Sequence, residues 1–283
     1  MRMQQTDWLP DKSMARRSFE AAAASYDQAA VLQREVGSRL LERLDFMKIE
    51  PTRKLDLGTG TGQCVAGLFA RFRSAEVVAL DIARSMLLQA RKRGRWLRRP
   101  RCVCGDAERL PFADSRFDLV FSNLTLQWCT DLEATFRELQ RVLRPGGLLL
   151  FTTLGPDTLR ELRDSWRSVD EYPHVTVFLD MHDDGDGLLK ARLSDPVVDV
   201  ERLTLTYHDV WKLMRELKQL GAHNVAAGRA RGLTGKAHMQ RLVEAYEHYR
   251  RDGLLPASYE VVHGHAWATS NEISVPLDRI TRR

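Results

Sequence analysis

Residues 53–62 read RKLDLGTGTG, and this segment is the strongest indication of the fold. Leu55 and Leu57 mark the end of a short buried strand, and the glycines that follow let a backbone turn come very close to a ligand. The helix after the turn directs free N–H groups at anionic parts of that ligand. A dinucleotide site would have its third glycine at position 63, where this chain has Gln63. The stretch therefore favours a ligand with a carboxylate and an amine over a pyrophosphate.

Further polar positions end the next strands along the chain. Asp81 ends the second expected strand, where an acid can accept hydrogen bonds from both ribose hydroxyls. Asp106 and Ala107 follow the third, where a carboxylate and a backbone N–H can read an adenine edge, and Asn123 ends the fourth. Ligands of open α/β sheets bind beyond the carboxyl ends of the strands. These residues therefore predict a nucleoside site beside the glycine turn.

Strand and helix patterns alternate along the first half of the chain. Expected strands cover residues 53–57, 76–81, 101–104, 117–123 and 147–155, and a helical pattern over 13–45 precedes them. The second half is less regular, with helical patterns over 155–169, 181–193, 211–220 and 236–250 and strand patterns over 200–210 and 258–270. This alternation predicts a Rossmann-like α/β fold, with a mainly parallel sheet and helices on both faces. Thr130 and Glu133 fit a capping box at the start of one helix.

Composition and charge exclude several classes of protein. The 283 residues are 43% hydrophobic and 29% charged, an ordinary globular mixture. We expect no membrane partner, because no stretch reaches the ~20 apolar residues that span a bilayer. The N-terminus lacks the apolar run of a secretory signal, and the four cysteines form no C-x-x-C pair, so we expect free thiols and a cytoplasmic location.

Much of the net charge of +5 lies in residues 91–101, RKRGRWLRRPR, with seven basic residues. We interpret this stretch either as a solvated helix end and loop or as a surface for an acidic partner. Nucleic acid is disfavoured, because the sequence lacks a recognition motif. His263 and His265 share one face of a strand, but no cysteine or acidic cluster joins them, so we expect no metal.

The ordered motifs of residues 50–155 resemble the class I methyltransferases, which use S-adenosylmethionine. The resemblance implies a seven-stranded sheet and assigns Asp56, Gly58 and Gly60 to the methionine part of the cofactor. It likewise assigns Asp81 to the ribose and Ile82 to packing on the adenine. The full set of candidate cofactor-binding residues comprises Gln33, Asp56, Gly58, Thr59, Gly60, Gly62, Asp81, Ile82, Asp106, Ala107 and Asn123.

The flanking segments resemble one family more closely, the malonyl-[acyl-carrier protein] O-methyltransferases. The similarity lies in residues 17–33, 122–129, 151–162 and 220–224. It implies transfer of a methyl group to the free carboxylate of a malonyl thioester on acyl carrier protein. The methyl ester that results would prime pimelate synthesis for biotin.

This chemistry explains why no general base stands out. The methyl of a sulfonium is already activated and a carboxylate is a competent nucleophile, so the enzyme must position the reactants and exclude water. Tyr26, Gln127 and Trp128 are positioning candidates, and the segment with Tyr26 and Gln33 resembles a lid that folds over the cofactor. Cations after the fifth strand are candidates for the substrate carboxylate, although each also fits a solvated surface: Arg160, Lys190 and Arg192.

The expected organisation is a helical lid over 1–48, a cofactor-binding core over 49–153, a substrate-side insertion over 154–200, the rest of the sheet over 201–269 and a tail over 270–283.

Three other functions stay open. Residues 157–163 and 213–217 also resemble protein-arginine hydroxylases of respiratory complex I assembly. A small-acid O-methyltransferase and a non-catalytic cofactor-binding scaffold are the others.

Overall fold

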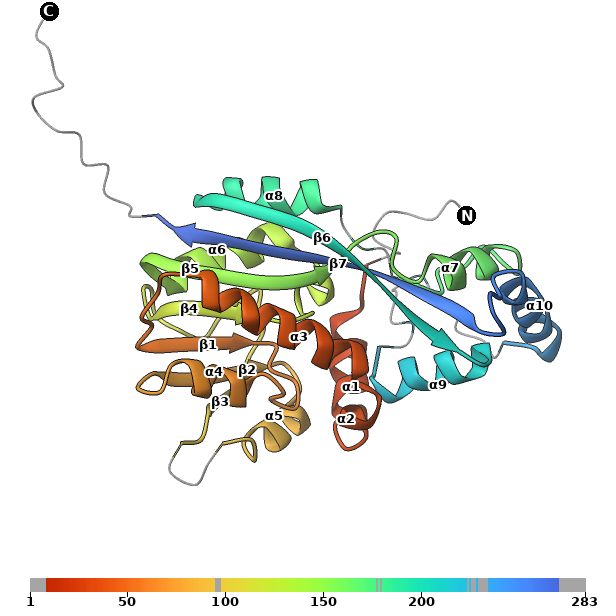
Figure 1. Ribbon diagram of the computed structural model, residues 1–283, viewed down its shortest axis with the longest axis horizontal. Coiled ribbons are helices and arrows are strands. Elements are labelled where there is room, and N and C mark those ends of the chain that lie inside the picture. Colours follow the sequence, from red (N-terminus) through yellow and green to blue (C-terminus); the bar gives the residue numbers. More distant parts are fainter. Residues whose placement is uncertain are drawn as a thin grey trace, which may run out of the picture.

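A computed structural model describes residues 9–94, 98–176, 178, 180–222, 224, 228 and 234–269. Its centre is a seven-stranded sheet in the order β3-β2-β1-β4-β5-β7-β6 (Figure 1). The first five strands pair in parallel, and β7 joins β5 and β6 antiparallel. The strands are β1 (Arg53–Leu57), β2 (Glu76–Asp81), β3 (Arg101–Cys104), β4 (Phe117–Ser122), β5 (Leu143–Leu154), β6 (Leu193–Tyr207) and β7 (Leu255–Ala268). The expected mainly parallel Rossmann-like sheet is confirmed.

Helices cover both faces of the sheet and cluster at one end of it. Figure 1 shows α1 and α2 beside the ends of β1 and β2, and α7, α9 and α10 grouped at one end of the long strands β6 and β7. The helices are α1 (Lys12–Ala22), α2 (Tyr26–Ala29), α3 (Val31–Arg43), α4 (Val65–Arg71), α5 (Arg84–Ala90), α6 (Leu132–Val142), α7 (Arg160–Arg167), α8 (Met181–Lys190), α9 (Val210–Gln219) and α10 (Lys236–Glu247). None of the helices in the described ranges is long and apolar enough to cross a membrane.

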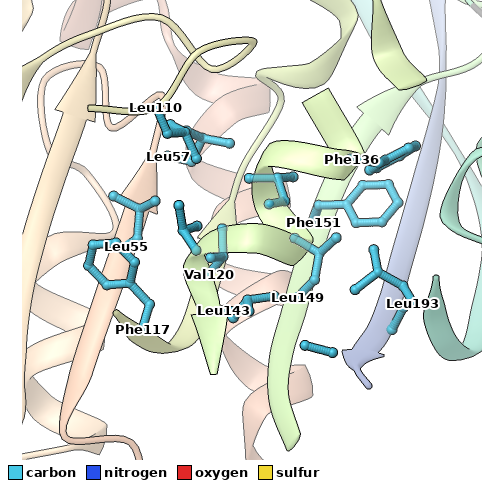
Figure 2. Packing of buried hydrophobic residues seen from close by; sticks show 14 of the residues in the cluster. Leu55, Leu57, Leu110, Phe117, Val120, Phe136, Leu143, Leu149, Phe151 and Leu193 are labelled. Atoms are coloured by element: carbon cyan, nitrogen blue, oxygen red, sulfur yellow. The ribbon is translucent and has the colours of Figure 1, made fainter. Parts of the chain in front are cut away.

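The alternation of side chains along the strands divides the core between two faces. On one face, Leu55 and Leu57 of β1 pack in a cluster with Phe136 of α6 and Leu188 of α8 (Figure 2). On the other, Phe121 of β4 and its neighbours pack against α3 and α4. Burying both faces fixes the register of every central strand, since a slip of one residue would exchange the two sets of side chains.

A separate hydrophobic cluster lies where β6 and β7 meet the helices of the second half of the chain. It joins Leu213 of α9, Leu242 and Tyr246 of α10 and Tyr259 of β7 to Trp166 of α7. This cluster supports the helices that extend beyond the carboxyl ends of the parallel strands.

Two local expectations were wrong. The helical pattern over 13–45 is broken into α1, α2 and α3, and the break before α3 falls at Ala30, whose ψ of 50° is not helical. The capping box is not used either. Asp131 caps α6 by accepting a hydrogen bond from the Ala134 N–H at 2.8 Å, while the Thr130 hydroxyl donates to Glu108. An aspartate one residue later competes successfully because its carboxylate is as strong an N-cap acceptor as a hydroxyl.

Asp184 on α8 is expected to make stability depend on pH. It is 1% exposed, and one of its oxygens has no hydrogen-bond partner among the described residues. Burial, together with the nearby charges of Asp183 and Asp180, raises its pKa to about 7. Because the folded state then binds more protons than the unfolded state between about pH 4 and pH 7, stability falls as pH rises through that window.

We therefore expect Asp184→Asn to raise the free energy of unfolding at pH 8 by roughly 1–3 kcal/mol, a cost of ~1.4 kcal/mol per pKa unit less the burial of an amide. The gain should shrink towards pH 4. Urea unfolding at both pH values measures it, with Glu133→Gln, which removes an exposed pair on α6, as control. An equal effect of Asp184→Asn at both pH values would contradict this explanation.

Candidate active site

A pocket opens at the carboxyl ends of the parallel strands and runs beneath the N-terminal helices. The structure brings many of the sequence-predicted residues to its wall, from β1, β2, β3 and β4 and from the lid. They are Tyr26, Gln33, Gly58, Gly60, Asp81, Ile82, Asp106, Ala107, Asn123, Gln127 and Trp128. Asp56 of β1 and Thr59 and Gly62 of the glycine turn do not line the pocket.

Three glycines of the turn, Gly58, Gly60 and Gly62, have positive φ, and the first two line the pocket. Gly58 has φ +66°, and a Cβ built on it would lie 2.1 Å from the Thr125 Oγ1. Gly60 has φ +55°, and its Cβ would face open space, with only the Tyr26 ring 4.0 Å away. The backbone at Gly60 can therefore approach a ligand closely, because no side chain stands between the two.

Two buried carboxylates fix this turn. Asp56 accepts a hydrogen bond from the Thr59 hydroxyl at 2.5 Å, and Asp81 accepts from the Gly60 N–H at 2.9 Å and the Ala83 N–H at 2.8 Å. Burial raises the pKa of Asp56 to about 7 and that of Asp81 to about 6, against the lowering effect of those donors. A ligand that brings hydroxyl or ammonium donors would stabilise the charged forms.

The adenine side of the expected site contains a partner that the sequence did not reveal. Lys12 of α1 lines the pocket and donates to both Asp106 oxygens, at 2.8 and 2.7 Å. It also pairs with Glu108 at 2.7 Å. Burial lowers the pKa of Lys12, but these two carboxylates outweigh burial and leave the pKa raised. An isolated lysine 94 residues before its partner gives no sequence signal.

Asn123 joins the sheet to the N-terminal helix α3. Its Nδ2 donates to the Gln33 backbone oxygen at 2.9 Å, and its Oδ1 accepts from the Thr152 hydroxyl at 2.9 Å. The side-chain oxygen of Gln33 is buried, and no described residue donates to it. Since Gln33 lines the pocket, this oxygen is an unsatisfied acceptor suited to the ammonium group of a ligand.

Two carboxylates of the N-terminal helices, Glu20 and Asp27, hold these helices against the core, and we call the contacts of each a latch. Glu20 of α1 accepts from the Arg84 N–H at 2.6 Å and the Ser85 N–H at 2.8 Å. Asp27 of α2 accepts from the Thr61 hydroxyl at 2.6 Å and from Gln63, and it also pairs with Arg93. Burial tends to raise the pKa of Asp27, but these donors leave it lowered. Together the two latches place Phe19 and Tyr26 at the pocket.

Loosening the second latch should speed release of the cofactor. Asp27→Asn removes the charge that binds Arg93 and one acceptor for Thr61, at a cost of about 1 kcal/mol. We expect the rate of S-adenosylhomocysteine dissociation to rise about 3–10-fold, as measured by stopped-flow displacement. Glu133→Gln, which removes a surface pair with Arg137 on α6, serves as control. An unchanged rate in Asp27→Asn would show that α2 does not retain the cofactor.

Beyond the glycine turn the pocket widens into a largely apolar chamber that the sequence did not predict. Gln127 and Trp128 line the pocket, and Trp128 meets Phe19 edge to face, with ring centroids 5.1 Å apart. The chamber is lined by Leu124, Leu154, Leu159, Leu162, Val175, Phe178, Leu217 and Leu220, with the polar residues Thr158, His174, Thr176, Glu216, Asn224 and Tyr259. These residues come from five separate segments between Leu124 and Tyr259, so no single sequence motif predicts them.

The three cations expected to bind the substrate are not brought to this chamber. Arg160, Lys190 and Arg192 are exposed and do not line the pocket, and the Arg160 side chain is 57% exposed. Arg160 begins α7 and points to Glu161, while Lys190 and Arg192 lie at the end of α8 and just after it.

The basic stretch over 91–101 is only partly described, because residues 95–97 lie outside the described ranges, as do His223 and the expected tail over 270–283. Arg93 and Arg101 form ion pairs with Asp27 and Glu76, so part of its charge is balanced locally. Within the described residues, no group of three or more histidine, cysteine or acidic side chains could hold a metal ion. His263 is buried beside Glu201.

Comparison with known proteins identifies the fold and the family. A family model described as "Methyltransferase domain" matches residues 55–151. Among solved structures, phosphoethanolamine N-methyltransferase 2 of Haemonchus contortus in complex with S-adenosyl-L-methionine has a TM-score of 0.55 and 22% identity. The match covers 89% of this chain and 57% of that one. The YcgJ protein of a Bacillus has a TM-score of 0.60 and 15% identity, covering 83% of this chain and 100% of that one.

Curated relatives extend over nearly the whole chain. A malonyl-[acyl-carrier protein] O-methyltransferase of Methylovorus sp. is 51% identical over 275 residues, which cover 95% of this chain and 93% of that protein. One from Halorhodospira halophila is 52% identical over 259 residues, covering 91% and 88%. With identity at this level over almost the full length, the chain belongs to the malonyl-[acyl-carrier protein] O-methyltransferase family.

Proposed function

We propose that this chain transfers a methyl group from S-adenosylmethionine to the free carboxylate of a malonyl group carried as a thioester on acyl carrier protein. The methyl ester then primes pimelate synthesis for biotin. The observation that carries the proposal is the continuity of the pocket, which runs from the Gly60 turn into the apolar chamber. The names of the relatives supply the substrate.

The residues present fit the cofactor. The bare backbone of Gly60 leaves room for the methionine part, and the unsatisfied Gln33 oxygen can accept from its ammonium group. Asp81, already held by two backbone N–H groups, would accept the ribose hydroxyls. Ile82 would pack on the adenine, whose edge would meet Asp106 and Ala107. The cofactor supplies a methyl group activated by its sulfonium.

The chain's own residues would position the reactants and keep water out of the site. A carboxylate oxygen forms the new bond to the methyl carbon as the carbon–sulfur bond breaks, so no proton has to be removed. Tyr26, Gln127 and Trp128 all line the pocket. Their packing, with Phe19 over Trp128, would exclude water and align the reacting atoms.

The proposed partner is acyl carrier protein, and the proposed location is the cytoplasm. All four cysteines are free, which suits a reducing compartment. The related readings as an arginine hydroxylase, a small-acid methyltransferase or a scaffold have no comparable support, since the curated relatives described above share one name.

The test is an assay with radiolabelled S-adenosylmethionine and four acceptors: malonyl-carrier protein, malonyl-coenzyme A, a small organic acid and an arginine peptide. We expect label on the malonyl thioester as a methyl ester, which alkali hydrolyses to release the label as volatile methanol. Label on the small acid alone would point to a different methyltransferase. No label on any acceptor, despite cofactor binding, would favour the scaffold.

A further inference from the structure

We infer that His174 is the residue that grips the malonyl carboxylate and orients it for methyl transfer. This inference rests on the proposed function and deepens it, because it names the group that selects a substrate with a free acid. Three observations carry it: the position of the imidazole, its pairing with Asp170, and the fact that the other nearby cations contact other groups outside the chamber.

His174 is built into the chamber wall rather than attached to the surface. Its ring stacks on the Trp166 indole, with centroids 3.7 Å apart and planes 5° from parallel. Its side chain is only 12% exposed, and the residue lines the pocket. The Nε2 atom lies 2.8 Å from an Asp170 oxygen. The stack and this pair hold the ring in one orientation and leave Nδ1 as the nitrogen available to a ligand.

The chemistry of the pair suits a carboxylate. With Nε2–H directed at Asp170, a neutral ring would present a bare acceptor at Nδ1, whereas the imidazolium presents a donor there. Asp170 balances the charge of that imidazolium. The other ionisable groups that face this part of the pocket are Glu216 of α9 and Tyr259 of β7, and neither can carry positive charge.

Other cations near the pocket do not line the chamber. Lys12 is bound to Asp106 and Glu108 at the adenine end. Arg163 of α7 donates from one guanidinium nitrogen to the backbone oxygens of Pro156 and Thr158; its buried Nε has no partner among the described residues, but Arg163 does not line the pocket. Among the described lining residues, His174 is therefore the remaining side chain that can become a cation in the chamber.

A single hydrogen bond from the Nδ1–H can bind the malonyl carboxylate and still leave it reactive. It holds one carboxylate oxygen and leaves the other free to attack the methyl group. A bidentate arginine would engage both oxygens and lower the nucleophilicity of each. His174 is thus a positioning and specificity-determining residue, and it takes no proton during the reaction.

The experiment compares carrier protein loaded with malonyl or with acetyl, which lacks the acid. Dissociation constants are measured in the presence of S-adenosylhomocysteine for the wild type, His174→Leu and His174→Asn. We expect His174→Leu to weaken malonyl binding about 10–100-fold and acetyl binding less than twofold. His174→Asn should recover part of the loss, because its amide can donate from nearly the position of Nδ1.

Two further variants keep the test decisive. Asp170→Asn removes the balancing charge without touching the stack, and should weaken malonyl binding about 3–10-fold while sparing acetyl. His182→Leu removes an exposed histidine that also pairs with an aspartate, and should change neither. Equal weakening of malonyl and acetyl binding, or no change in Asp170→Asn and His174→Leu, would overturn the assignment. Failure of the wild type to methylate malonyl thioester would instead refute the proposed function.

Discussion

Asp81→Ala should weaken binding of S-adenosylmethionine and S-adenosylhomocysteine about 10–100-fold, which corresponds to the 1–3 kcal/mol lost with a charge-assisted contact. The carboxylate is buried and held by the Gly60 and Ala83 N–H groups, so it is fixed before any ligand arrives. Removing it deletes the contact to the ribose. It also removes the hydrogen bonds that fix the glycine turn at the methionine end of the site. Isothermal titration calorimetry measures the change.

The isosteric Asp81→Asn separates these two effects. Its amide can keep one of the two backbone contacts, so the turn should hold its shape better than in Asp81→Ala while the charge is lost. Glu133→Gln again serves as a distant control. Unchanged affinity in Asp81→Ala would mean that this carboxylate does not hold the ribose.

Gly58→Ala should both destabilise the protein and abolish cofactor binding. The new Cβ would lie 2.1 Å from the Oγ1 and 2.3 Å from the Cγ2 of Thr125, at a residue whose φ is +66°. Thr125 cannot swing away freely, because its hydroxyl donates to the Leu57 oxygen at 3.2 Å. Overpacking and the left-handed backbone together cost on the order of 2–5 kcal/mol.

Gly146→Ala is the matched control for Gly58→Ala. Gly146 has φ +75°, but a Cβ there would meet no heavy atom within 4 Å. Only the backbone strain remains, about 1–2 kcal/mol, and cofactor affinity should not change. Urea unfolding and calorimetric titration of both variants measure the contrast. Similar losses of stability and affinity in the two would show that close packing at the turn is unimportant.

The part of the fold that the sequence predicts is the part governed by local pattern. The strand ending at Leu57 and the glycine turn after it are contiguous, and parallel strands bring their carboxyl ends to one edge, so Asp81 and Asn123 were expected beside the turn. The antiparallel placement of β7 between β5 and β6 could not be expected in the same way, because it depends on pairing of segments far apart in the chain.

The chamber shows the limit of sequence patterns more clearly. Their charge and their place after the fifth strand make Arg160, Lys190 and Arg192 candidates in the sequence. Charge does not tell which face of a helix meets the pocket, however, and all three are exposed. His174 gave no signal, since its meaning depends on Trp166 and Asp170 around it. Lone polar residues acquire a role only when tertiary packing surrounds them.

The most direct test of the central claim is a crystal structure of the protein grown with S-adenosylhomocysteine. We predict the nucleoside between Asp81 and Asp106, with the amino-acid tail over Gly60 and its ammonium group near the Gln33 side chain. The sulfur should then face the chamber beside Gln127. Density for the ligand elsewhere, or a cleft left empty at saturating ligand, would contradict the account.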